Sequence, residues 1–131
     1  MKKVENFFRS LENLKDVYKY EPPYENVILS GLVALYGLCF EQSWKAMKEI
    51  LESQGFDESK TGSPKQILKA AYQSGLITDE TLWLEALLSR NNVTHAYNHK
   101  VALDIIQKTK DHYVQMFLDL KREIENTMSE Q

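Results

Sequence analysis

The chain has 131 residues, of which 43% are hydrophobic and 27% are charged, and its formal net charge is -3. This length and composition suit a single domain, residues 1–131, with a buried core. The net negative charge argues against nonspecific electrostatic binding of nucleic acid over the whole surface, because proteins that bind in that way normally carry an excess of basic residues. Any contact with RNA must therefore come from a local patch.

The sequence offers neither a convincing membrane-spanning segment nor a signal peptide. The longest apolar run, residues 27–40, is interrupted by Ser30 and two glycines, and it is shorter than the roughly 20 residues needed to cross a bilayer. Near the N-terminus, Glu5 and Glu12 break up any apolar core. The single cysteine, Cys39, is typical of a small buried hydrophobe. We therefore expect a cytoplasmic protein that does not contact the membrane.

The first two predicted helices are long. One covers about residues 1–20 and ends at Pro22 and Pro23, because proline bars helix at the preceding residue and lacks a backbone donor. The second covers about residues 24–54. Their apolar stripes are Val4, Phe7, Phe8, Leu11, Leu14 and Tyr18, then Leu29, Leu32, Val33, Tyr36, Phe40, Trp44, Met47 and Leu51.

Two shorter helices are predicted after a polar loop at residues 55–62. Ser63 is suited to cap the first of them, with Pro64 at the first helical position and a glutamine three residues after the serine. This helix is expected to stop near Gly75. Thr78 is the expected cap of the next helix, and acidic residues follow it at the positive end of the helix dipole. The buried side of that helix is Leu82, Trp83, Ala86 and Leu87.

The last predicted helix covers about residues 97–128, and no strand-like alternation of useful length appears anywhere. The sequence therefore predicts an all-α fold, an up-and-down bundle of about five helices with three long ones forming the body. The apolar positions of the last helix follow alternating steps of three and four: Ala102, Ile106, Thr109, Tyr113, Met116, Leu120 and Ile124.

The segment "SRNNVTHAYNHK", residues 89–100, gathers polar hydrogen-bonding groups between two helices. In an unbroken helix Arg90 and His95 would lie about 140° apart around the axis. Asn91 and Asn92 are poor helix formers whose side chains compete for backbone hydrogen bonds, so they are expected to end the helix there. Such a break would allow Arg90 and His95 to converge, with Tyr97 close by.

An arginine and a histidine that converge suit chemistry on a phosphodiester. Arginine offers a planar charged fork to phosphate oxygens, and histidine transfers protons near neutral pH. In RNA the 2′-hydroxyl is a built-in nucleophile, so neither a metal nor a cofactor is expected. One histidine serves as either base or acid, and a two-fold dimer would supply the second.

Plainer interpretations of the same residues stay open. Arg90 can cap the last carbonyls of its helix while His95 is an ordinary polar residue in a turn. His95 and His99 have the i,i+4 spacing of a metal site, but neither the usual intervening glutamate nor an obvious third ligand accompanies them. We therefore predict no metal ligands.

The stretch "RNNVTHAY", residues 90–97, matches the R-X4-H-X-Y signature of HEPN-domain proteins of the HepT type. The stretches "FEQSWKAMKEILESQGF", "GSPKQILKAAYQSGLI" and "LWLEALLSRNNVTHAYN" resemble the branch known as nucleotidyltransferase substrate-binding proteins. The resemblance runs from about Phe40 to Asn98 and, more loosely, through both terminal helices. It implies a HEPN-like four-helix core with additional short helices.

The resemblance also implies partners and roles. The chain would form a homodimer, alone or within a heterotetramer, and bind a minimal nucleotidyltransferase as the toxin of a toxin–antitoxin pair. As a metal-independent endoribonuclease it would use Arg90 and His95 as the catalytic pair, and Arg90 with Asn91 would bind the phosphate of RNA or nucleotide. Tyr97 would be the phenol that the partner adenylylates. An adenylate there would occupy the RNA site and offset its positive charge.

Two alternatives to the ribonuclease remain. The name of the branch implies a non-catalytic subunit that binds a nucleotide or another substrate for the transferase, and it would use the same Arg90, Asn91 and His95 cluster. A third hypothesis is a scaffold that only docks the partner through an exposed helix face.

Overall fold

The computed structural model describes residues 1–56 and 62–130, and every regular element in these ranges is helical. This confirms the predicted all-α fold. The elements in chain order are α1 (Lys2–Leu14), the 3-10 helix η1 (Lys15–Lys19), α2 (Asn26–Ser53), α3 (Pro64–Ser74), α4 (Glu80–Asn91), the 3-10 helix η3 (Asn92–His95), α5 (His99–Lys108), the π-helical turn η4 (Thr109–Tyr113) and α6 (Val114–Ser129).

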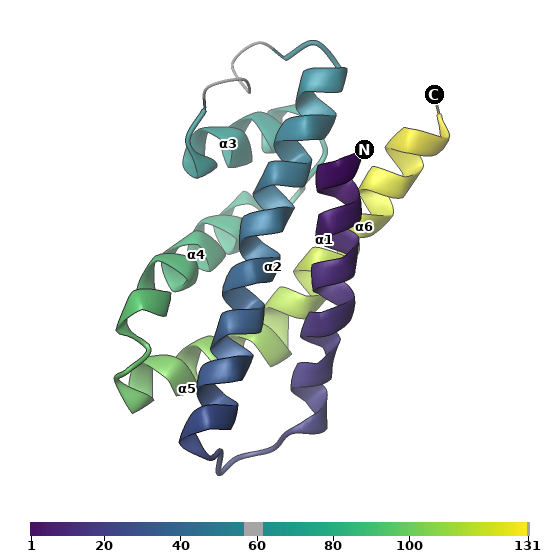
Figure 1. Cartoon of the computed structure of the whole chain (residues 1–131). Helices are drawn as coiled ribbons and strands as arrows, with labels where there is room; N and C mark the ends of the chain where they lie inside the picture. The colour runs from purple at the N-terminus through teal and green to yellow at the C-terminus, as the bar shows by residue number, and fades with distance from the viewer. Residues whose placement is uncertain (57–61, 131) are drawn as a thin grey trace.

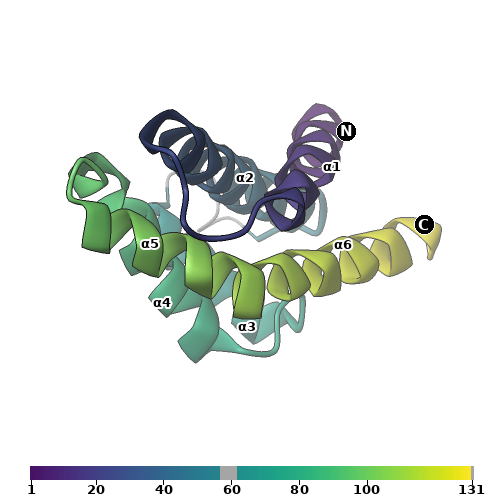
Figure 2. The same cartoon turned by 90° about the horizontal axis from the view of Figure 1, so that it is seen from below.

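The helices form an up-and-down bundle (Figure 1). α1 and α2 are antiparallel neighbours, α4 runs back alongside α2, and α3 is a short helix at one end of the bundle. Seen from below, α5, η4 and α6 form one continuous helical stretch that crosses in front of the other helices, while α3 and α4 pack directly against α2 (Figure 2). The long helices therefore supply the body of the bundle, as the sequence predicts.

The core is held together by aromatic side chains from three separate parts of the chain. Tyr36 of α2 stacks on Tyr113 with ring centroids 5.2 Å apart, and its hydroxyl donates a hydrogen bond of 2.6 Å to the carbonyl of Ala86 in α4. A buried hydrogen bond of 2.7 Å joins the hydroxyls of Ser89 and Tyr113. These bonds satisfy polar groups that would be costly to bury alone, and they fix the C-terminal end of α4 against α2 and η4.

α2 is the central helix. By length and composition alone it could cross a membrane; one side of it, with Leu32, Tyr36 and Phe40, is buried inside the bundle. Cys39 lies on this buried side, and burial raises the pKa of its thiol to about 12. The thiol is therefore protonated near neutral pH and chemically inert, which confirms Cys39 as a small buried hydrophobe.

Helix boundaries agree with the sequence at some ends and differ at others. Ser63 forms the predicted capping box with Gln66, and Gly75 ends α3 with a φ of 83°. The predicted cap at Thr78 is wrong, because the side chain of Asp79 accepts the hydrogen bond from the Leu82 amide. Both residue types are good caps, and the backbone places the aspartate at the turn.

The two terminal helices are less regular than their apolar stripes suggest. The α-helical part of the first ends at Leu14 and continues as η1, where Tyr18 is half-exposed and donates a hydrogen bond to the carbonyl of Lys110. The last helix begins at His99, capped by the side chain of Asn98, and contains a π-helical turn. Most of the loop predicted at residues 55–62 lies outside the described residues.

Candidate functional site

Arg90 lies in the last turn of α4, where its charge complements the negative end of the helix dipole. α4 ends at Asn91, and the chain continues through the four residues of η3. This confirms that the asparagine pair ends the helix. The side chain of Val93 in η3 packs over Gly37 of α2, where an added Cβ would lie 3.7 Å from a Val93 methyl group. The turn after Arg90 is therefore anchored against the central helix.

The guanidinium of Arg90 has two side-chain partners. One terminal nitrogen donates a hydrogen bond of 2.6 Å to Oε2 of Glu41 in α2, and the other donates a bond of 3.2 Å to Oδ1 of Asn91. Glu41 also lies 3.9 Å from the ammonium of Lys45, one turn further along α2. Because the side chains of Arg90 and Glu41 are 31% and 29% exposed, water and incoming ligands can reach both.

These residues line a cleft between α2 and the α4–η3 turn. Its volume is about 540 Å³, within the range of small-ligand sites. Leu38 is 58% exposed on its wall, so an apolar surface lies beside the charged pair. The lining residues are Ala34, Gly37, Leu38, Glu41, Arg90, Asn91, Val93 and Thr94.

His95 and Tyr97 form a second group just beyond the cleft. His95 ends η3, and its ring meets the ring of Tyr97 edge to face with centroids 6.2 Å apart. Both side chains are exposed, and Tyr97 is 87% exposed. The amide of Asn98 donates to the carbonyl of His95, and the Asn98 side chain caps α5. The pair is therefore held on a short, well-bonded turn with its functional atoms facing solvent.

The structure thus brings the predicted residues together as two adjacent pairs. Arg90 and Asn91 share the cleft, and His95 and Tyr97 share the turn that follows. Within the described part of this single chain, the hydrogen-bond partners of the guanidinium are Glu41 and Asn91, and His95 is not one of them. The catalytic pairing of Arg90 with His95 stays a prediction.

Glu41 is the residue that sequence reasoning missed. It lies 49 positions from Arg90, so no local spacing rule connects the two. The one available signal was that Glu41 is the first charged residue after the uncharged stretch at residues 26–40. A charge that directly follows such a stretch, on a helix that is otherwise core, needs a polar partner nearby.

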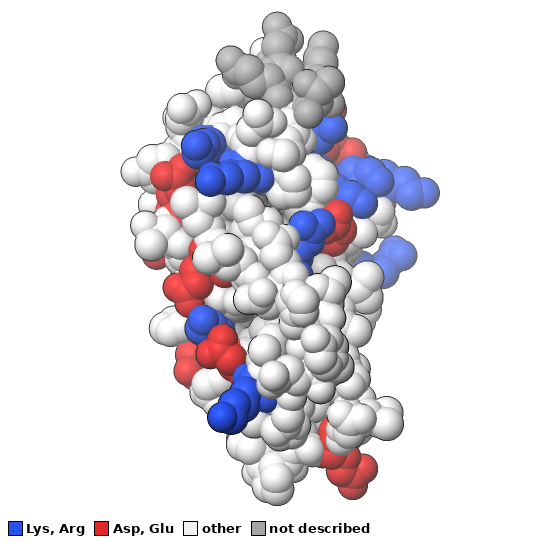
Figure 3. Space-filling view, turned by 90° about the vertical axis from the view of Figure 1, so that its left-hand side faces the viewer, with Lys and Arg blue, Asp and Glu red and all other residues white. Residues whose placement is uncertain are grey.

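On the face drawn in Figure 3, the described residues form no continuous basic area. Figure 3 shows the side of the molecule on which α3, α4 and the start of α5 lie, where positive and negative side chains alternate and a broad area is uncharged. This agrees with the net charge of -3. An anionic ligand would therefore be attracted by particular side chains and not by the field of the whole face.

The protein is a small helical bundle with an arginine–asparagine pair on a cleft and a histidine–tyrosine pair on the turn that follows. Residues 2–126 match the family described as nucleotidyltransferase substrate binding protein like. The chain belongs to this family.

Similarity to individual proteins agrees with that assignment. The chain is 25% identical over 93 residues to a Haemophilus influenzae protein named "Probable ribonuclease HepT"; the match covers 70% of this chain and 64% of that protein's length. A Thermus thermophilus protein of known crystal structure is 26% identical, with a TM-score of 0.77 over 87% of this chain and 94% of that one.

The fold is also that of HI0074 from Haemophilus influenzae, whose structure was described as the fold of a substrate binding domain of a nucleotidyltransferase. The identity is 19% and the TM-score is 0.81, over 93% of this chain and 98% of that one. At this identity the likeness concerns the fold.

Proposed function

We propose that this protein is the ribonuclease partner of a minimal nucleotidyltransferase, a toxin that the transferase silences by adenylylating Tyr97. The observation that carries the proposal is the placement of Arg90 and Asn91 on an open cleft, followed within one short turn by the exposed pair of His95 and Tyr97. The family and the similarity to a ribonuclease-named protein support it.

In the proposed reaction the 2′-hydroxyl of RNA attacks the adjacent phosphorus and the bond to the 5′-oxygen breaks. The products are a cyclic phosphate and a 5′-hydroxyl. Arg90 stabilises the charge that develops on the phosphate oxygens. His95 takes the proton from the nucleophile, and its symmetry mate gives a proton to the leaving oxygen. These bond changes require neither a metal ion nor a cofactor.

The second histidine requires a homodimer, which belongs to the proposal. Exposed apolar side chains that share one helix face support it, because contiguous exposed apolar patches mark contact surfaces. Val27 and Leu38, which lie on the same face of α2, are 81% and 58% exposed. Leu38 lies on the wall of the cleft itself. A two-fold contact through this wall would bury these groups and bring two copies of the site together.

Ribonuclease activity is tested by incubating the purified protein with single-stranded and structured RNA in EDTA. We expect cleavage by the wild type and a loss of at least about a hundredfold in His95→Ala, the usual scale for losing a general acid or base. His112→Ala is the matched control, because His112 is exposed on η4, away from the cleft. Equal cleavage by all three proteins would remove His95 from the mechanism.

Adenylylation is tested by intact-mass measurement after incubation with the transferase and ATP. The Tyr97 oxygen would attack the α-phosphorus, pyrophosphate would leave and the phenolic proton would pass to solvent. We expect one added AMP on the wild type and none on Tyr97→Phe. Tyr72→Phe, which alters another exposed tyrosine on α3, should be modified normally. An unchanged mass gain in Tyr97→Phe would place the acceptor elsewhere.

One observation favours a second candidate, a non-catalytic subunit that binds nucleotide for the transferase. The carboxylate of Glu41 neutralises Arg90 within the cleft, which reduces the charge available to stabilise a transition state and suits reversible binding of a nucleotide better than catalysis. This candidate predicts saturable nucleotide binding that depends on Arg90, no RNA turnover, and normal growth when the chain is expressed alone. RNA cleavage that requires His95 would decide against it.

A further inference from the structure

A second cleft lies between the α3–α4 connection and α6. Its volume is about 320 Å³, near the lower end of the range for small-molecule sites. The floor is apolar and includes Leu76, Trp83, Met116 and Leu120, all of them buried. Asp79 at this cleft and Arg90 lie at opposite ends of α4, about 16 Å apart along its axis. The cleft is therefore separate from the proposed ribonuclease site.

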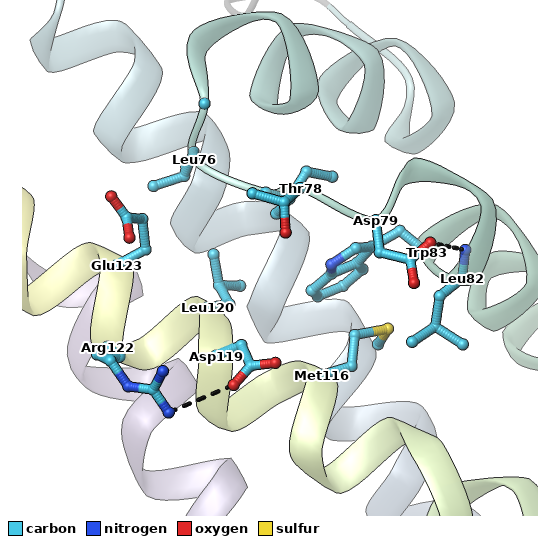
Figure 4. A pocket seen from close by; sticks show the side chains of 12 residues that line it. Leu76, Thr78, Asp79, Leu82, Trp83, Met116, Asp119, Leu120, Arg122 and Glu123 are labelled. Carbon is cyan, nitrogen blue, oxygen red and sulfur yellow. Dashed lines mark hydrogen bonds and ion pairs between the residues drawn. The ribbon is translucent and has the colours of Figure 1, made fainter.

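Trp83 presents an unpaired hydrogen-bond donor to this cleft. Its side chain is only 2% exposed and packs against Phe40 and Phe117. Among the described residues, the atoms that are fully buried without a partner are Gln42 Oε1 and Trp44 Nε1. Trp83 Nε1 also has no hydrogen-bond partner among the described residues but is not fully buried, so it is open to the cleft that Trp83 lines. In Figure 4 the nitrogen edge of the indole faces the space between Thr78 and Leu120.

The rim of the cleft is acidic. Asp79, Asp119 and Glu123 line it together with one base, Arg122, which leaves a formal excess of two negative charges. Arg122 is already paired with Asp119 at 3.4 Å. Asp79 uses one carboxylate oxygen to cap α4, and Glu123 has no hydrogen bond or ion pair to any described residue. Figure 4 shows Asp79 and Glu123 on opposite sides of the indole.

We propose that this cleft binds a small organic cation, an alkyl guanidinium or ammonium compound that also carries a hydrogen-bond acceptor. The apolar floor suits the alkyl chain, and the acidic rim suits the cationic head. The indole N–H is a donor only, so it requires an acceptor such as a carbonyl oxygen. Phosphate-bearing ligands are disfavoured because the rim repels them. The inference does not depend on the ribonuclease proposal.

The test uses N-acetyl-arginine methylamide as the probe and the indole N–H signals of ¹⁵N-labelled protein as the readout. The chain has two tryptophans, and a Trp44→Phe variant assigns the signal of Trp83. We expect the chemical shift of the Trp83 indole signal to change in a saturable way with millimolar probe, while that of the Trp44 signal does not change. The neutral isostere N-acetyl-citrulline methylamide should bind distinctly more weakly.

Rim charge is tested with two variants that each remove one carboxylate from α6. Glu123→Gln alters the cleft, whereas Glu125→Gln alters an exposed residue that does not line it. We expect the Kd of the probe to rise about threefold to fivefold in Glu123→Gln, as expected for a partly screened charge pair, and to be unchanged in Glu125→Gln. The proposal is overturned if the Trp83 signal does not respond, if the citrulline probe binds equally well, or if both variants behave alike.

Discussion

The ion pair between Arg90 and Glu41 determines the orientation and the charge of the arginine in the proposed catalytic cleft. A guanidinium has five N–H donors in a planar fork, and here one terminal nitrogen is bonded to a carboxylate and the other to Asn91. The contacts hold the fork in one orientation. They also cancel its charge locally, so an incoming phosphate competes with Glu41 for the same group.

Replacing Glu41 with glutamine is expected to tighten RNA binding. The amide oxygen can still accept from Arg90, while the negative charge that opposes phosphate is lost. We expect the Kd for a fluorescent RNA oligonucleotide, measured by anisotropy in EDTA and low salt, to fall about threefold to tenfold. Glu125→Gln carries the same charge change far from the cleft and should leave the Kd nearly unchanged. Weaker binding by Glu41→Gln alone would mean that the carboxylate mainly positions the arginine.

At the scale of elements, the contact between η3 and α2 places the polar turn. Val93 packs over Gly37, and the backbone of the turn is closed by bonds from Ala96 to Val93 and from Asn98 to His95. The turn is therefore a short bonded connection with few free torsions. The packing of Val93 against α2 orients the turn toward the cleft.

Two glycine replacements should change stability in opposite directions. Gly37→Ala places a Cβ at an ordinary contact distance of 3.7 Å from Val93 and improves helix propensity, so we expect a gain of about 0.5–1 kcal/mol. Gly75→Ala forces a side chain onto a φ of 83°, so we expect a loss of about 1–2 kcal/mol. Urea unfolding measures both. A loss of stability in Gly37→Ala would show that the added methyl group displaces Val93 and η3 from α2.

Helices and helix caps were predictable where the residues that determine them lie close together in the sequence. All seven apolar positions predicted for the last helix, from Ala102 to Ile124, are buried, because a stripe at steps of three and four has one way to face a core. The capping box at Ser63 likewise depends on four consecutive residues. The π-helical turn at residues 109–113 was not visible, since one extra residue in a turn barely disturbs that spacing.

At the scale of the whole molecule, the position of the polar segment was predictable but the partners of its residues were not. The breaking asparagines and the polar composition locate the segment at residues 90–97. The contact of Arg90 with Glu41 depends on how α2 and α4 pack, over a separation of 49 residues. The choice of Asp79 over Thr78 as a cap depends on the path between α3 and α4. Neither is encoded in short-range spacing.

The proposed reaction requires that two copies of the protein form a dimer. We expect Leu38→Asp to convert a dimer into a monomer, because Leu38 is 58% exposed on the cleft wall. Burying a leucine contributes about 1.5–3 kcal/mol, and two-fold symmetry counts it twice, so the dimer Kd should rise at least about a hundredfold. Light scattering with size-exclusion chromatography measures the mass.

Tyr72→Asp is the control for this substitution, since Tyr72 is 48% exposed on α3, at the other end of the bundle from the cleft. It should leave the mass unchanged. If Leu38→Asp is still dimeric and folded, the two-fold contact lies on another face, and the second histidine of the proposed mechanism would have to be sought there.

The near-complete exposure of Tyr97 separates what this residue does from how the protein folds. A side chain that is 87% exposed gives up little more than its edge-to-face contact with His95 when it is exchanged. The fold therefore does not depend on the aromatic ring, and substitution or modification of Tyr97 should leave the protein folded. A phenotype produced by such a substitution therefore comes from the loss of a surface function and not from a loss of stability.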